Sequence, residues 1–192
     1  MSRSEEVRDF YERMPYPAPR TNLDAHRDHY MNPDRRRAEF HLMWPAKQPR
    51  GGQEILIAGC GTSQAARYAL REPDARITAI DISDTSLRHT RDLQRKYNLE
   101  NLELHQLAIE RVREIGRSFD LVVCTGVLHH LPEPDHGLAT LRSVLRPSGA
   151  ARLMVYARYG EISTPPSKRY RRPIRFQASC GVRRISIGQA LY

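Results

Sequence analysis

The feature that most constrains the fold is an apolar segment that runs directly into a glycine pair and then into a helix-forming stretch. Residues 55–61 read Ile-Leu-Ile-Ala-Gly-Cys-Gly, and residues 65–71 follow without a helix breaker. A second apolar segment, 76–81, ends on Asp81, 22 residues after Gly59. Glycines at a strand-to-helix turn let the backbone approach a ligand closely, and an acid at this spacing can accept hydrogen bonds from ribose hydroxyls. The pattern predicts the start of a nucleotide-binding βαβ unit.

The glycine spacing argues against a nicotinamide or flavin dinucleotide as the ligand. The dinucleotide fingerprint has a glycine three residues after its second glycine, where it permits close packing of the helix on the strand. Here the second glycine is Gly61, and the required position holds Gln64. We therefore expect a different nucleotide-like ligand.

Three segments further along the chain extend this pattern. Residues 119–124 (Phe-Asp-Leu-Val-Val-Cys) have the composition of a buried strand, 126–132 (Gly-Val-Leu-His-His-Leu-Pro) follow it, and 145–150 (Leu-Arg-Pro-Ser-Gly-Ala) lead into another apolar run. Together with the glycine turn, and in the same order and spacing, they resemble motifs of the class I S-adenosylmethionine-dependent methyltransferases. The resemblance covers roughly residues 53–159. Each segment alone is a weak signal, whereas four in register are specific.

The resemblance implies a fold, a cofactor and a reaction. The fold is α/β and Rossmann-like, with a doubly wound, mostly parallel sheet and helices on both faces. We expect this sheet to be incomplete at its C-terminal end. The cofactor is S-adenosyl-L-methionine, and the reaction is methyl transfer to an acceptor that the sequence does not identify.

The resemblance also implies roles for individual residues of the cofactor site. Gly59, Cys60 and Gly61 would lie under the methionyl end of the cofactor, at the positive end of the following helix. Asp81 would accept from the ribose hydroxyls, and Ile82 would pack on the adenine face. The alternative for Asp81 is that it caps the helix that begins just after it.

Three positions depart from the commonest pattern of the family. Ile57 stands where an acid is usual and Ser63 where a third glycine is usual, and both changes occur in a branch of the family that reads Ala-Gly-Cys-Gly-Thr. Ala108 stands near a position at which many relatives carry an aspartate that accepts from the adenine amino group. Alanine cannot accept, so adenine recognition is left to backbone groups and apolar packing.

The aromatic and histidine candidates each have a structural alternative. In the family, the loop that contains His129 and His130 borders the sulfonium and the substrate. His129 is therefore a candidate for lining the site, and the favoured alternative is that the pair is only part of the loop structure. A metal site is disfavoured, because adjacent side chains in extended chain point to opposite sides and no i, i+4 pair is present. Tyr11 and Tyr16 form either a lid over the cofactor or packing on the sheet edge. No residue stands out as a catalytic base.

Composition divides the chain into three segments. Residues 1–52 are expected to form a helical, proline-rich cap, residues 53–159 the S-adenosylmethionine-binding domain, and residues 160–192 a poorly ordered basic tail that is truncated or altered relative to the family. The tail carries seven Lys and Arg residues against one acid, which is +6 of the net charge of +9. Basicity is thus a property of the tail, and nucleic-acid binding through it is an alternative that we do not favour.

The remaining composition excludes several classes of protein. A content of 28% charged and 40% hydrophobic residues is typical of a soluble globular domain. No apolar run approaches the roughly 20 residues that span a bilayer, and the N-terminus lacks the apolar core of a signal peptide, so we expect a cytoplasmic protein. Three widely spaced cysteines predict neither a disulfide framework nor a zinc site. A non-catalytic or degenerate cofactor-binding protein remains the second alternative.

Overall fold

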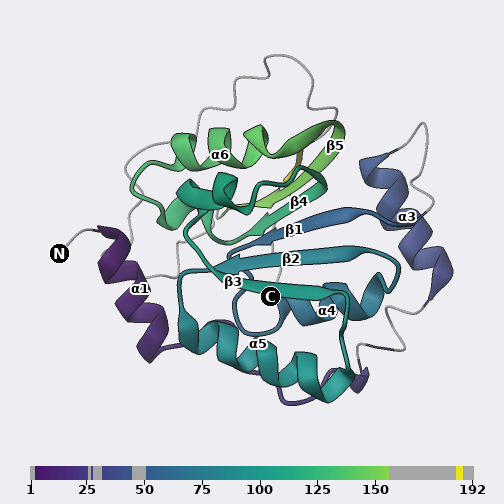
Figure 1. Cartoon of the computed structure of the whole chain (residues 1–192), viewed down its shortest axis with the longest axis horizontal. Coiled ribbons are helices and arrows are strands. Elements are labelled where there is room, and N and C mark those ends of the chain that lie inside the picture. The colour runs from purple at the N-terminus through teal and green to yellow at the C-terminus, as the bar shows by residue number, and fades with distance from the viewer. Residues whose placement is uncertain (1–2, 26, 28–31, 45–50, 156–184, 188–192) are drawn as a thin grey trace.

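The computed structural model describes residues 3–25, 27, 32–44, 51–155 and 185–187. Within these residues the strands form one parallel sheet in the order β3-β2-β1-β4-β5-β6 (Figure 1). The strands are β1 (Glu54–Ala58), β2 (Arg76–Asp81), β3 (Leu102–Gln106), β4 (Phe119–Thr125), β5 (Leu145–Met154) and β6 (Ile185–Ile187). The chain runs outward from β1 to β3 and then returns to the other side of β1, so the strand order reverses between β1 and β4. In sheets of this kind, ligands bind at the carboxyl ends of the strands beside this reversal.

Helices cover both faces of the sheet. The helical elements are α1 (Arg3–Arg13), α3 (Pro33–Met43), α4 (Gln64–Arg71), α5 (Asp84–Tyr97), η1 (Ile109–Ile115), η2 (Leu128–His130) and α6 (Pro134–Ser143), of which η1 and η2 are 3-10 helices. Ile55 and Ile57 of β1 face a core shared with α3, α4 and α5. Leu56 and Ala58 face a second core shared with η1, η2 and α6. The doubly wound parallel fold predicted from the sequence is confirmed, and burial on both faces explains the apolar runs of the central strands β1 and β4.

The sequence predicts a helix over residues 135–145 and a strand over residues 150–156, with a turn between them, and the predicted bounds near this turn are wrong. α6 ends at Ser143, two residues before the predicted end at Leu145, and β5 begins at Leu145 instead of Ala150. Leu145 pairs with Phe119, and the register shifts before the next pair of partners. Pro147 and Gly149 led to the prediction of a turn. The backbone instead pairs with β4 along this irregular start. This pairing depends on contacts with a distant strand, which a local turn signal does not record.

The sequence predicts a helix over residues 33–41 with Asn32 as its N-cap, and the structure confirms this start at α3. The side chain of Asn32 accepts hydrogen bonds from the backbone N–H groups of Asp34 (2.9 Å) and Arg35 (3.3 Å), and Pro33 occupies the first turn. Such a cap satisfies donors that have no partner within the helix. The sequence also predicts a poorly defined helix near residues 109–115, and this segment forms the 3-10 helix η1.

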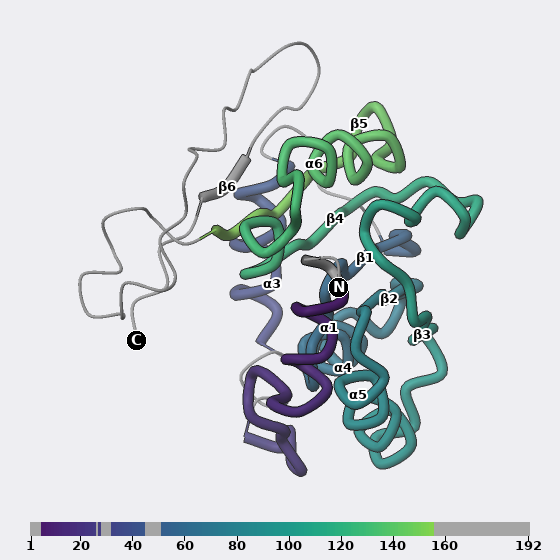
Figure 2. The backbone as a smooth tube through the Cα atoms, turned by 90° about the vertical axis from the view of Figure 1, so that its left-hand side faces the viewer, coloured from purple at the N-terminus to yellow at the C-terminus, as the bar shows by residue number. Residues whose placement is uncertain are grey.

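Helix α1 is attached to the amino-terminal end of α5 (Figure 2). The carboxylate of Glu12 accepts from the backbone N–H of Asp84 (2.6 Å), from the backbone N–H of Thr85 (3.1 Å) and from the hydroxyl of Thr85 (2.5 Å). A carboxylate at a helix N-terminus satisfies unpaired donors and interacts favourably with the helix dipole. This attachment brings the segment that follows α1 over the carboxyl ends of the strands.

Of the residues after Gly160, the structure describes only β6. Its three residues pair in parallel with Ala151 to Leu153 of β5. The sequence also allows a weak hairpin between this segment and residues 174–178. Those residues and the rest of the basic tail lie outside the described residues, so the expectation for the tail stays a prediction. In the described part of the chain, no helix combines the length and apolar character needed to cross a membrane.

Candidate functional site

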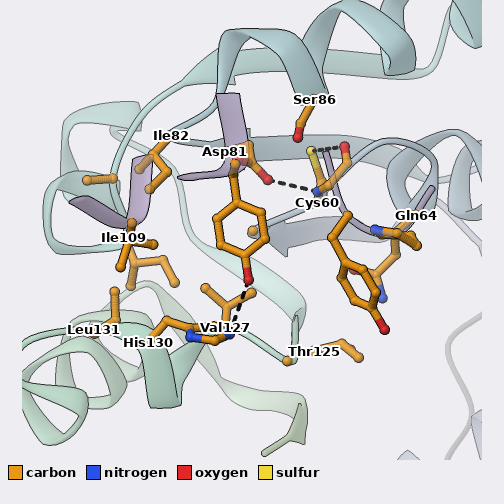
Figure 3. A pocket seen from close by; sticks show the side chains of 18 of the residues that line it. Cys60, Gln64, Asp81, Ile82, Ser86, Ile109, Thr125, Val127, His130 and Leu131 are labelled. Atoms are coloured by element: carbon orange, nitrogen blue, oxygen red, sulfur yellow. Dashed lines mark hydrogen bonds between the residues drawn. The ribbon is translucent and has the colours of Figure 1, made fainter. Parts of the chain in front are cut away.

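A pocket of about 300 Å³ lies at the carboxyl ends of the strands. This volume is at the lower end of the roughly 300–1,000 Å³ typical of small-molecule sites. Its walls come from the N-terminal segment, the glycine turn with the start of α4, the ends of β2 and β3, and the loop after β4 (Figure 3). The pocket therefore lies beside the reversal of strand order, where the topology predicts a ligand.

The two glycines of the turn adopt left-handed backbone conformations, with φ of +70° at Gly59 and +55° at Gly61. A Cβ at Gly59 would lie 2.3 Å from a methyl of Val127, and one at Gly61 would lie 2.9 Å from the carbonyl oxygen of Tyr16. The close approach that these glycines permit is therefore to neighbouring protein segments. From the sequence we expected an approach to the ligand as well, which stays a prediction, and both residues line the pocket.

Asp81 joins the glycine turn to the start of α5. Its Oδ2 accepts from the backbone N–H of Gly61 (2.8 Å), and its Oδ1 accepts from the backbone N–H of Ser83 (3.0 Å) (Figure 3). The N-cap of α5 is Ser83, whose hydroxyl accepts from the N–H of Ser86 (3.1 Å), so the capping alternative for Asp81 is not needed. Burial raises the pKa of Asp81, although the two backbone hydrogen bonds act in the opposite direction. Each carboxylate oxygen keeps further capacity to accept from a ligand.

Beyond Asp81 the wall of the pocket is mainly apolar. Ile82 follows β2, and Leu107, Ala108 and Ile109 follow β3, so two adjacent strands deliver this wall at one edge. Ala108 precedes η1 and contributes no side-chain cap. Glu110 also lines the pocket. Glu110 was not predicted from the sequence, although its position directly after the Ala108–Ile109 pair offered a signal.

The structure places Tyr11 and Tyr16 in the pocket wall and corrects the histidine assignment by one residue. The hydroxyl of Tyr11 lies 3.2 Å from Nε2 of His130, which lines the pocket (Figure 3). His129, the residue named from the sequence, is 5% exposed and is not part of the wall. The two imidazole rings are 4.2 Å apart, because this segment is the 3-10 helix η2 and not extended chain.

The start of α4 contributes three further polar residues to the wall, namely Ser63, Gln64 and Arg67. In the sequence, Ser63 and Gln64 stood out only as departures from glycine motifs, and Arg67 was not singled out. The available signal was the spacing of four residues between Ser63 and Arg67, which places two side chains on the same side of a helix.

Comparison with known proteins identifies the family. A family model described as a methyltransferase domain matches residues 56–151, which is half of the chain. An uncharacterized protein of Synechococcus is 43% identical over 112 residues, covering 57% of this chain and 27% of that protein. A ubiquinone biosynthesis O-methyltransferase of Albidiferax ferrireducens is 29% identical over 122 residues, covering 63% and 46%. A tRNA U34 carboxymethyltransferase of Pseudoalteromonas translucida is 31% identical over 134 residues, covering 69% and 41%. The chain thus spans less than half the length of these curated relatives.

Solved structures share the fold at low sequence identity. Magnesium protoporphyrin IX methyltransferase from Synechocystis, with bound S-adenosylmethionine, has a TM-score of 0.53 at 21% identity, over 76% of this chain and 73% of that chain. The N-methyltransferase NodS from Bradyrhizobium japonicum, with bound S-adenosyl-L-homocysteine, has a TM-score of 0.53 at 20% identity, over 76% and 70%. The match to the methyltransferase-domain model, the glycine turn and this shared fold together show that the chain belongs to the class I S-adenosylmethionine-dependent methyltransferase family.

Proposed function

We propose that the chain binds S-adenosylmethionine in this pocket and transfers its methyl group to a nucleophilic atom of an acceptor. The observation that carries the proposal is the hydrogen bond from Gly61 to Asp81, which brings the two parts of the nucleotide-binding motif together in the wall of one pocket. Membership of the methyltransferase family supports the same function.

The residues present fit the adenosine part of this cofactor. Asp81 is a half-buried carboxylate with capacity to accept from the ribose hydroxyls. Ile82 and Ile109 offer apolar surface to a planar ring, and Ala108 leaves its recognition to backbone groups. A mainly apolar wall with a few placed polar groups is the usual character of a small-molecule site.

The N-terminal segment and the loop after β4 form the opposite side of the pocket. When bound, S-adenosylmethionine supplies a methyl group on a sulfonium sulfur, which an acceptor nucleophile takes in one displacement step. Tyr16 and Pro17 cover Gly61, and the hydroxyl of Thr62 donates to the carbonyl oxygen of Pro17 (2.8 Å). A segment held in this way can align the reactants and exclude water. For an acceptor that must lose a proton, we assign proton acceptance to Nε2 of His130.

The fold alone does not decide between turnover and binding without methyl transfer. A [4+2]-cyclase also shares it, with a TM-score of 0.51 at 24% identity. The relatives named above differ in what they modify, so small molecules, proteins and RNA are all acceptor classes to be tested. The experiment must therefore measure cofactor binding and methyl transfer separately.

The first measurement is calorimetry with S-adenosylhomocysteine. We expect binding in the micromolar range or weaker by the unmodified chain, and loss of binding in Asp81→Ala. Arg95→Gln, on the exposed far part of α5, serves as the matched control. Absence of binding by folded, unmodified protein, or equally strong binding of NADH, would overturn the proposal.

The second measurement is transfer of a labelled methyl group into cell extract. We expect labelling that depends on the chain and is absent with Asp81→Ala, and digestion with nuclease or protease then sorts the acceptor class. Cofactor binding without labelling of any pool would identify a non-catalytic cofactor-binding protein. Labelled RNA would require a further test of salt dependence, because contacts with phosphates weaken as salt rises.

A further inference from the structure

Two polar atoms in the wall of the pocket have no hydrogen-bond partner among the described residues. They are Oγ of Ser63, a fully buried residue, and Nε of Arg67. Ser63 is the N-cap residue of α4, yet its hydroxyl makes no cap hydrogen bond. Arg67 also forms no ion pair within the described part of the chain. Buried polar groups are nearly always paired in native proteins, so an unpaired set that faces a pocket indicates a ligand.

The two residues lie together at the amino-terminal end of α4. The backbone N–H of Arg67 donates to the carbonyl oxygen of Ser63 (3.1 Å), which sets the two residues one turn apart, and both line the pocket. Backbone N–H groups at a helix N-terminus and the helix dipole favour an anion at this position. A hydroxyl donor, a guanidinium and a helix N-terminus therefore converge on one part of the wall.

The acidic residues of the pocket lie in its other part. Asp81 is held by the N–H groups of Gly61 and Ser83, and Glu110 follows β3. Neither forms an ion pair with Arg67 in the described structure. The charges of the wall are thus divided, with acceptors toward the adenosine side and donors at the start of α4.

We propose that Ser63 and Arg67 bind the carboxylate of the amino-acid end of the cofactor. This inference rests on the proposed function and deepens it, because it assigns the donors for one charged group of the ligand. A carboxylate is planar and accepts two parallel hydrogen bonds from a guanidinium, and hydrogen bonds between charged groups are stronger than neutral ones. Ser63 stands where the family commonly has glycine, so this chain gains a donor at that position.

The test compares S-adenosylmethionine with decarboxylated S-adenosylmethionine, which lacks only the carboxylate. Calorimetry is done with the unmodified chain, Arg67→Gln, Arg67→Lys and Ser63→Ala, with Arg95→Gln as the matched control. We expect Arg67→Gln to weaken binding of S-adenosylmethionine by about 10- to 100-fold, Ser63→Ala by about 5-fold, and Arg67→Lys by less than Arg67→Gln. Binding of the decarboxylated ligand should change by less than about 2-fold in every variant.

The outcomes separate this inference from the proposed function. If the unmodified chain binds S-adenosylmethionine and Arg67→Gln binds it equally well, the carboxylate assignment is wrong and the function stands. If Arg67→Gln weakens both ligands to the same degree, Arg67 has a structural role and the assignment is again wrong. Failure of the unmodified chain to bind either ligand overturns both proposals. Ser63→Ala removes a single oxygen, so it carries the test if Arg67→Gln does not fold.

Discussion

At Asp81 a single carboxylate connects the glycine turn to the start of α5. Under the proposed function, it also supplies acceptors for the ligand. The structure raises its pKa through burial, so its protonation begins at a higher pH than for a free aspartate, whose pKa is about 3.9. Protonation turns one acceptor oxygen into a donor. We therefore expect the affinity for S-adenosylhomocysteine to be constant at neutral pH and to fall as the pH is lowered through this raised pKa.

Calorimetry across a pH series measures this effect, with Asp81→Asn as the comparison. The variant cannot ionise at this position, so we expect weaker binding at neutral pH and loss of the acid-dependent decrease. The same decrease in the variant would assign the pH dependence to another group and remove Asp81 from the binding site.

A side chain introduced at Gly61 would have two effects, namely backbone strain and collision with neighbouring atoms, and a second glycine allows them to be measured separately. A side chain there meets the carbonyl oxygen of Tyr16 at 2.9 Å and the ring of Pro17 at 3.2 Å, in a backbone with φ of +55°. Gly116 has φ of +71°, and no described atom lies within 4 Å of the place that a Cβ would take, so it provides a control with strain alone. We expect Gly61→Val and Gly116→Val each to lose about 1–2 kcal/mol of unfolding free energy from strain. Only Gly61→Val should also lose binding of S-adenosylhomocysteine.

Urea unfolding of both variants measures the unfolding free energy, and calorimetry measures the binding of S-adenosylhomocysteine. Retained binding in Gly61→Val would show that Tyr16 and Pro17 can move away without affecting the site. Equal loss of binding in Gly116→Val would show that the effect is general destabilisation.

At the scale of elements, the attachment of α1 to α5 depends on the carboxylate of Glu12. Burial acts to raise the pKa of Glu12, but hydrogen bonds from Thr85 and Asp84 outweigh it, so the pKa is lowered. A lowered carboxyl pKa contributes stability that is present above the unfolded value, about 4.3, and is lost as the pH falls through the folded value. We expect Glu12→Gln to lower the unfolding free energy by about 1 kcal/mol at neutral pH.

The difference between Glu12→Gln and the unmodified chain should disappear as the pH falls through the lowered pKa of Glu12. We also expect weaker binding of S-adenosylhomocysteine, because α1 carries Tyr11 and leads to Tyr16. Glu6→Gln, an exposed position on the same helix, is the matched control. Equal effects of the two substitutions on stability and binding would refute a specific role for Glu12.

At the scale of the molecule, the pocket joins segments from the N-terminus to the end of β5. A ligand that binds only the folded state stabilises all of them together. At 100 times its dissociation constant, S-adenosylhomocysteine should add about 2.7 kcal/mol, which raises the Tm of a chain of this size by about 5 to 11 °C. Scanning calorimetry measures the shift, and Asp81→Ala should abolish it. An unchanged Tm despite binding in the calorimeter would show that the unfolded chain binds equally well.

Much of the fold was predictable because its signals are local. The bounds of β2 follow from an apolar run, and β3 follows from the alternation of Leu102 and Leu104 with polar residues. The cap of α3 follows from Asn32 and Pro33. The family resemblance placed Asp81 and the glycine turn in one site, because the carboxyl ends of parallel strands meet at one edge. These features depend on residues a few positions apart or on the direction of a strand.

The sequence by itself therefore determined the parallel sheet, the cofactor family and the edge at which the site lies. Only the tertiary structure decided that His130 and not His129 faces the pocket, because the turn of η2 sets that orientation. It also decided that Glu12 caps a helix 72 positions away and that Arg67 enters the wall with its Nε unpaired among the described residues. Such features arise from packing between distant segments, which no local pattern in the chain records.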